Sequence, residues 1–215
     1  MEAASELLAE GGVDALTTRS LAEHTGMPVA TIYQYFENRD AIIAAYLDHD
    51  LERIEESFTS ALMALERVTF RSMAEAGALA HLRHHQAHPE GVQAWFGGRL
   101  NAAVVDRVQA LESRLAASMR SAVAGTGITQ GGPEFIAALQ VRLFDRMFEF
   151  VFLAERTAEQ QEEIVLSFVD IVSTYMERFV APGGLEGISP EQFVRALTED
   201  PTFLLSENPT ISESR

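Results

Sequence analysis

Apolar residues recur every three or four positions through most of the chain, the spacing of one face of an α-helix. The stretch after Asn38 shows this spacing most regularly, with acids and arginines between Leu47, Leu51, Ile54, Phe58, Leu62 and Leu65. We find no run of alternating apolar and polar residues, bounded by turn residues, that would mark a β-hairpin. The pattern therefore predicts an all-α fold.

Three short helices are predicted at the amino terminus. The first covers residues 2–9 and is stopped by a glycine pair. The second follows Thr17, which is expected to be its N-cap, and ends at Gly26. The third opens at Pro28, where a first-turn proline is tolerated, and runs through Tyr35. Two helices joined by a tight glycine turn form the arrangement expected of a DNA-binding helix-turn-helix.

Glycine and proline also divide the rest of the chain. One long helix is expected after Asn38, and further helices are predicted over 71–88, 92–100, 101–124, 134–155, 158–180 and 189–197. We expect a helix-turn-helix DNA-binding domain over 1–45 and a second helical domain, the body, over 46–200. A loosely ordered tail is expected over 201–215.

The most informative stretch runs from Leu16 to Phe36 and reads LTTRSLAEHTGMPVATIYQYF. Five apolar residues have the spacing to close a small core between the two helices: Leu16, Leu21, Ala22, Met27 and Ile32. The other side chains of the second helix are short or hydrogen-bonding, so this surface can approach base edges and phosphates closely. It suits a recognition helix in a major groove, although the aromatic residues alone are also compatible with packing of the helical head.

This motif resembles the TetR family, in which a helix beginning Leu-Thr leads to a glycine turn and a recognition helix ending Tyr-x-Tyr-Phe. The resemblance covers about residues 2–45, and beyond them only helix order and length are similar. It implies a transcriptional repressor that binds a palindromic double-stranded operator as a homodimer. It places DNA contacts at Thr17, Thr18, Arg19, Pro28, Val29, Ala30, Thr31, Tyr33, Gln34, Tyr35 and Arg39, the last replacing a phosphate-binding lysine.

The charge of the chain argues against DNA binding. Its formal net charge is -16 and all of its 16 basic side chains are arginine, so the averaged field repels nucleic acid. The family's usual basic arm is also missing ahead of the first helix, unless the true start lies upstream. We therefore expect few phosphate contacts and a shallow salt dependence, at about 0.9 log units per log of salt for each phosphate neutralised. A helical interaction protein that does not bind DNA is the alternative.

The body is expected to hold a small-molecule effector and to form the dimer. By the resemblance, the apolar helices over 134–155 and 158–180 pair with their copies, although burial inside a monomer core would explain them as well. Aromatic and methionine side chains suggest a pocket for a hydrophobic or aromatic effector, and ordinary core packing is the alternative for each: Met63, Phe70, Met73, Trp95, Phe96, Phe144, Phe148 and Phe152.

Four histidines occupy one predicted helical face at i, i+3, i+4 and i+7: His81, His84, His85 and His88. This geometry can bind a transition metal, which makes a metal-sensing repressor a further alternative. No acid before Glu90 joins them in the segment, and Arg83 would oppose a cation. A histidine patch on the surface or at a pocket rim is the simpler interpretation.

Other classes of protein find no support in the sequence. Catalytic and phosphate-binding motifs are missing, so neither an enzyme nor a cofactor is expected. The chain has no cysteine, which excludes disulfides and Cys-ligated zinc. Neither a signal peptide nor a membrane-spanning run is recognisable, and we expect a cytoplasmic protein without a membrane partner.

Overall fold

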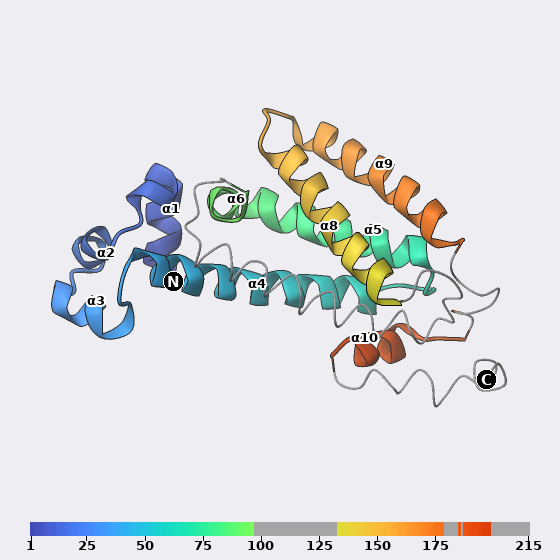
Figure 1. Cartoon of the computed structure of the whole chain (residues 1–215), viewed down its shortest axis with the longest axis horizontal. Coiled ribbons are helices and arrows are strands. Elements are labelled where there is room, and N and C mark those ends of the chain that lie inside the picture. The colour runs from blue at the N-terminus through green and yellow to red at the C-terminus, as the bar shows by residue number, and fades with distance from the viewer. Residues whose placement is uncertain (97–132, 179–184, 186, 199–215) are drawn as a thin grey trace. The chain divides into compact units, whose positions relative to one another are not determined.

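A computed structural model of the chain describes residues 1–96, 133–178, 185 and 187–198. Within these ranges every regular element is a helix, which confirms the all-α prediction (Figure 1). None of the described helices combines the length and apolar character needed to cross a bilayer. The helix predicted over 101–124 and the tail over 201–215 lie outside the described residues.

The described helices form two compact units, and the predicted domain boundary at residue 45 stays a prediction. Among the described residues, the first unit comprises 1–56 and 83–96, and the second comprises 57–82 and the described residues from 133 onward. The first unit therefore includes the beginning of α4 (Arg39–Met63) and the end of α5 (Phe70–Ala87).

Three short helices open the first unit: α1 (Glu2–Ala15), α2 (Thr18–Thr25) and α3 (Val29–Tyr35). In the same unit α1 packs against α2 and against α6 (Pro89–Phe96) (Figure 1). Their apolar faces share one core with the first turns of α4: Ala4, Leu7, Leu8, Leu16, Leu21, Ala22, Ile32, Ile42, Ile43, Tyr46, Leu47 and Ala94. This core holds the helix-turn-helix to the start of the long helix.

The glycine pair in α1 kinks the helix instead of ending it. Gly11 and Gly12 leave helical geometry, with φ of -150° and 63°, but the helix resumes and continues to Ala15. The predicted stop after residue 9 is therefore wrong. The start predicted for α6 at residue 92 is also late, because the missing N–H of Pro89 costs nothing in a first helical turn and the helix begins there.

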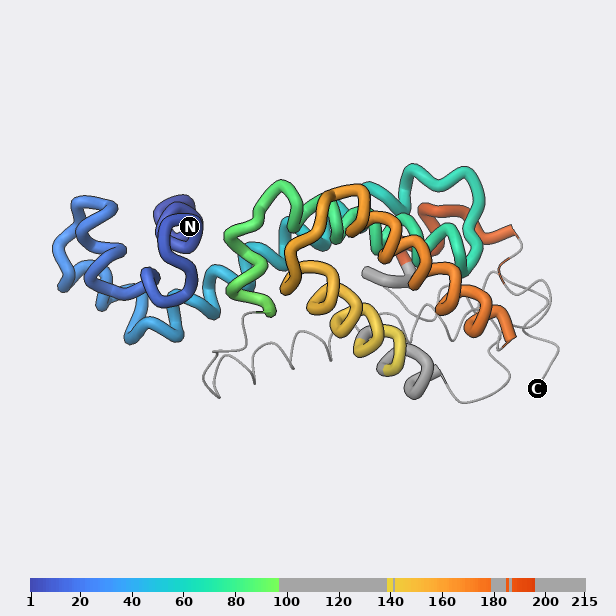
Figure 2. The backbone as a smooth tube through the Cα atoms, turned by 90° about the horizontal axis from the view of Figure 1, so that it is seen from above, coloured from blue at the N-terminus to red at the C-terminus, as the bar shows by residue number. Residues whose placement is uncertain are grey.

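The second unit contains the pair α8 (Pro133–Phe152) and α9 (Ala158–Met176), which a short connection turns antiparallel. Figure 2 shows them side by side. Thr157 caps α9 in a reciprocal pair of hydrogen bonds with Gln160. Phe70 of α5 packs with Val172 and Met176 of α9. The short helix α10 (Pro190–Thr198) packs through Phe193 against Leu62 and Val68.

Candidate nucleic-acid interface

A reciprocal hydrogen-bonded cap fixes the start of α2. The Thr17 side chain accepts from the Ser20 amide at 3.0 Å, and the Ser20 hydroxyl accepts from the Thr17 amide at 2.9 Å. Two backbone donors that α2 leaves unpaired at its start are satisfied in this way. The N-cap predicted at Thr17 is confirmed.

The turn between α2 and α3 depends on Gly26, whose φ of 68° and ψ of 12° are left-handed. A side chain is strained in this conformation, and glycine adopts it freely. Pro28, predicted to open the helix, is instead its N-cap with φ -57°, and α3 runs from Val29 to Tyr35, where it was predicted to end. The two helices and their turn therefore have the predicted geometry of a helix-turn-helix.

Helix α3, the predicted recognition helix, has one buried residue and a broad exposed face. Ile32 is 3% exposed and anchors the helix in the core. Tyr33 and Tyr35 are 55% and 74% exposed. The predicted base-contacting residues Val29, Ala30 and Gln34 are exposed as well, and Thr31 is half-buried. The hydroxyls of Tyr33 and Tyr35 and the amide of Gln34 thus belong to exposed residues.

Met27 does not belong to the small core in which its spacing placed it. It is 50% exposed, whereas Leu16, Leu21, Ala22 and Ile32 are all buried. The prediction is wrong because Met27 lies in the turn that Gly26 opens, outside both helices. Periodicity carries no information there about the direction of a side chain.

A side-chain contact that the sequence did not predict joins the two helices on their exposed surface. The Thr18 hydroxyl donates to the Tyr33 hydroxyl at 3.3 Å, across 15 residues of sequence. This bond positions the Tyr33 ring on α3. Only the crossing of the two helices brings these residues together.

Both arginines of the first 46 residues bind neighbouring acids. Arg19 pairs with Glu23 one turn later at 2.9 Å, with both side chains largely exposed. Arg39 donates to the carboxylate of Asp14 at 3.0 Å and to the carbonyl of Val13 at 2.5 Å. Residues 1–46 contain seven acids against these two arginines. Neither guanidinium therefore faces solvent as an unpaired cation.

Residues 1–46 match a family described as bacterial regulatory proteins, tetR family. The chain is similar to this family over its first three helices and the start of α4. The class D tetracycline repressor of Escherichia coli is 36% identical over 94 residues, which cover 38% of this chain and 42% of that repressor. The class H repressor of Photobacterium damsela subsp. piscicida gives the same figures. The chain thus spans less than half the length of the curated relatives that it matches.

Solved structures extend the likeness of this chain beyond its first helices. TetR of Acinetobacter baumannii AYE covers 84% of the chain and 96% of its own length at 20% identity, with a TM-score of 0.56. A variant of that protein in complex with minocycline has a TM-score of 0.60 at 21% identity. PfmR of Thermus thermophilus covers 80% of the chain and 92% of its own length at 20% identity, with a TM-score of 0.54. At these identities the likeness concerns the fold.

The four histidines predicted on one face have different surroundings. The His81 ring packs on Phe148 in the second unit, with ring centroids 4.1 Å apart. His88 accepts a hydrogen bond from the Arg53 guanidinium. His84 and His85 are buried in the first unit. The histidines therefore do not act as one set.

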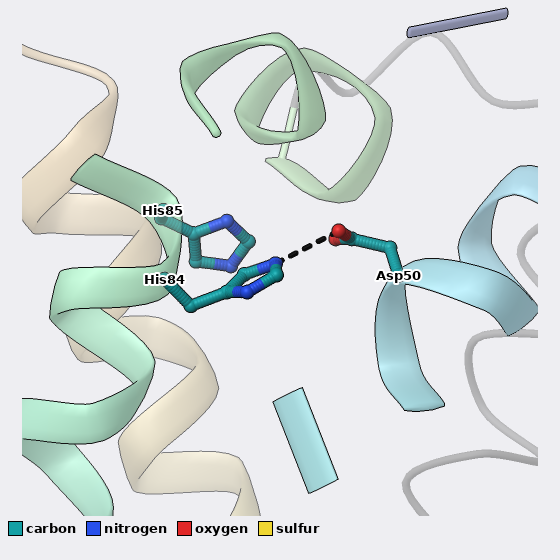
Figure 3. A group of neighbouring side chains, drawn as sticks. All are labelled: Asp50, His84 and His85. Carbon is teal, nitrogen blue, oxygen red and sulfur yellow. Dashed lines mark hydrogen bonds and ion pairs between the residues drawn. The ribbon is translucent and has the colours of Figure 1, made fainter. Parts of the chain in front are cut away.

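An acid that the sequence did not connect with the histidines joins two of them. Asp50 of α4 is 1% exposed, and its Oδ1 accepts from His84 Nε2 at 2.8 Å (Figure 3). Its Oδ2 accepts from the indole N–H of Trp95 at 2.6 Å. Burial raises the pKa of the Asp50 carboxyl, but the bonds from His84 and Trp95 and the charges of His84 and Arg53 outweigh burial and lower it. Asp50 is therefore a buried carboxylate that links α4 to α5 and α6.

The predicted effector-pocket residues fall in both units. Trp95 and Phe96 belong to the first unit, where Trp95 binds Asp50. In the second unit Phe148 stacks on Phe152 at 6.0 Å and lies 6.4 Å from Phe144, while Phe70 and Met73 pack with Phe144. Met63 is 42% exposed.

Two cavities of the second unit are lined by other residues. One, of about 710 Å³, lies among Arg71 and residues of α9 that include Glu159, Glu163 and Asp170. The other, of about 90 Å³, lies between α8 and α9. The predicted pocket residues line neither of these two cavities, and the pocket stays a prediction.

Proposed function

We propose that this chain is a TetR-type transcriptional repressor that binds a palindromic operator as a homodimer, with α3 of each subunit in the major groove. The observation that carries the proposal is the division of α3 into a buried and an exposed face. One buried residue, Ile32, anchors the helix, and Tyr33, Gln34 and Tyr35 are exposed. A helix that enters the major groove needs one face held in the protein and one face free to meet the hydrogen-bonding base edges. As a regulator of transcription, the protein is proposed to act in the cytoplasm.

The structure of the interface favours base contacts over phosphate contacts. Gln34 can form a bidentate pair with adenine, and the Tyr33 ring is oriented by Thr18. Arg19 has to exchange Glu23 for a phosphate before it can bind DNA. Arg39, bonded to Asp14 and Val13, serves first to hold α4 against the end of α1.

Substitutions on α3 test this proposal. The full chain is used to select duplexes from a random pool, and affinity for the selected duplex is measured by fluorescence anisotropy. A good bidentate base contact is worth about 1–3 kcal/mol, so Gln34→Ala is expected to weaken binding by about 5- to 150-fold. Tyr33→Ala is expected to weaken it also. The matched control is Gln93→Ala, an exposed glutamine of α6 in the same unit.

The test compares the duplex affinities of Gln34→Ala and Gln93→Ala. Loss of affinity in Gln34→Ala and none in Gln93→Ala supports α3 as the DNA-reading helix. Equal affinity of all three variants and the unsubstituted chain would show that α3 does not read DNA. Failure to enrich any duplex would favour the alternative of an interaction protein that does not bind DNA.

The homodimer is supported by the apolar surface that α8 and α9 leave exposed. Ile171 and Tyr175 of α9 are 69% and 42% exposed, and Phe150 and Leu143 of α8 are 59% and 37% exposed. The cavity between the two helices opens among Leu139, Leu143, Ile171 and Tyr175. Pairing of α8 and α9 with their copies would cover this surface in a four-helix, two-fold interface.

The effector is proposed to be a small hydrophobic or aromatic compound. The support is the aromatic group of the second unit, in which Phe144 also meets Phe168 edge to face at 5.3 Å. A protein of the same fold, the variant from Acinetobacter baumannii AYE, is described in complex with minocycline. Such a compound is expected to release the selected duplex in the anisotropy assay, and release that persists in Phe148→Ala would argue against a pocket at this residue.

A further inference from the structure

The buried polar cluster of Asp50, His84 and His85 has no part in the proposed DNA contacts. One potential ligand atom from each residue lies within 4.8 Å of the others. The three residues are 1%, 6% and 1% exposed. Figure 3 shows both imidazoles on the side of α5 that faces Asp50.

Burial of this set is unfavourable unless the groups interact strongly with one another. An ionised carboxylate loses several kcal/mol of hydration on leaving water. Ordinary apolar packing would fill this site between α4, α5 and α6 at lower cost. The burial of a carboxylate beside two imidazoles therefore indicates that their polar atoms bind something.

The donor set matches a divalent transition-metal ion. Imidazole nitrogens and a carboxylate oxygen are the usual ligands of Zn²⁺, Co²⁺ and Ni²⁺, and three protein ligands leave a fourth position for water. Ligands about 2.0–2.1 Å from one zinc ion lie roughly 3.3 Å from each other. Asp50 Oδ1 and His84 Nε2, at 2.8 Å, are already near that separation. Small side-chain rotations would bring a ring nitrogen of His85 to the same separation from these two atoms.

Trp95 gives the carboxylate the outer support that metal ligands commonly have. Its indole N–H holds Asp50 Oδ2 at 2.6 Å, which orients Oδ1 toward the imidazoles. Arg53, whose charge also acts on Asp50, is bonded to His88.

We propose that Asp50, His84 and His85 bind one divalent first-row transition-metal ion of the Zn²⁺, Co²⁺ and Ni²⁺ class. Before the ion binds, the Nε2 proton of His84 lies in the bond to Asp50. It must leave to solvent or move to Nδ1, so that the Nε2 lone pair faces the ion. The ion would connect α4 to α5 in the unit that contains α3. This inference does not depend on DNA binding.

Titration of the full chain with Co²⁺ tests the site. The protein carries no polyhistidine tag and is stripped with EDTA and dialysed before the titration. Visible absorption reports Co²⁺ coordination, and displacement by Zn²⁺ gives the zinc affinity. Binding of one ion per chain is expected, with a rise in the thermal unfolding temperature.

Matched histidine variants assign the ligands. Loss of an outer-shell partner alone costs about 10- to 100-fold in metal affinity, and Trp95→Phe is expected to do this. His85→Gln and Asp50→Asn are expected to cost at least as much. His81→Gln, from the same helix, and His49→Gln, from α4, are expected to bind as the unsubstituted chain does. Circular dichroism in EDTA confirms that each variant is folded.

Two results overturn the proposal. One is the absence of Co²⁺ and Zn²⁺ binding by the unsubstituted chain, a result that needs no variant to fold. The other is undiminished binding by His85→Gln. Either result leaves the DNA-binding proposal intact, because the titration contains no DNA.

Discussion

At the scale of single residues, the helix-turn-helix depends on a few backbone requirements that are visible in the sequence. Thr17 and Ser20 satisfy the free amides at the start of α2, and Gly26 supplies the left-handed turn. These features follow from local chemistry, so they could be predicted. The exposure of Met27 and the bond from Thr18 to Tyr33 could not, because both depend on how the two helices cross.

Replacement of Gly26 tests the left-handed turn. No atom lies within 4 Å of an added Cβ, so the cost of Gly26→Ala is that of the backbone conformation alone. We expect a loss of about 1–2 kcal/mol in the free energy of unfolding, measured by chemical denaturation. Gly26→Asn, which tolerates this conformation better, is expected to lose less. Equal stability of Gly26→Ala and the unsubstituted chain would mean that the turn adopts another geometry.

At the scale of elements, periodicity located the helices but did not show which helices pack against one another. The predicted spans of α5, α8 and α9 agree with the structure to within a few residues at each end. The histidine face of α5 shows the limit of such reasoning. Two of its members meet Asp50, which lies 34 residues before His84 on another helix. No spacing within one segment reveals a site that is assembled from two.

The exposed faces of α8 and α9 lead to a prediction about assembly. Ile171→Glu adds a charge at a residue that is 69% exposed in the single chain, so the fold of one subunit should tolerate it. In the proposed dimer the charge would be buried without a partner, and sedimentation is expected to show a shift toward monomer. Met63→Glu is the control, since Met63 is also apolar and 42% exposed but lies on α4. A dimer that survives Ile171→Glu and dissociates with Met63→Glu would place the interface elsewhere.

At the scale of the whole molecule, two properties oppose each other: a recognition helix and a net charge of -16. The structure sharpens this conflict, because both arginines of residues 1–46 are paired with acids and little free positive charge is available for phosphates. In the proposed complex, affinity for DNA then comes from base contacts and from the two copies of α3. The all-α class was predictable from periodicity, and the motif predicted the likeness to the TetR family over the first helices. The division into two units was not predictable, because it depends on the packing of α6 against α1.

Hydroxyl-radical footprinting of the selected duplex tests the central claim most directly. If α3 of two subunits reads successive major grooves, two protected half-sites related by a two-fold axis should appear, with centres about 10 base pairs, or a multiple of that distance, apart. The pattern should vanish with the Tyr33→Ala, Gln34→Ala double variant. One unpaired protected stretch, or two half-sites that the double variant still protects, would contradict the account.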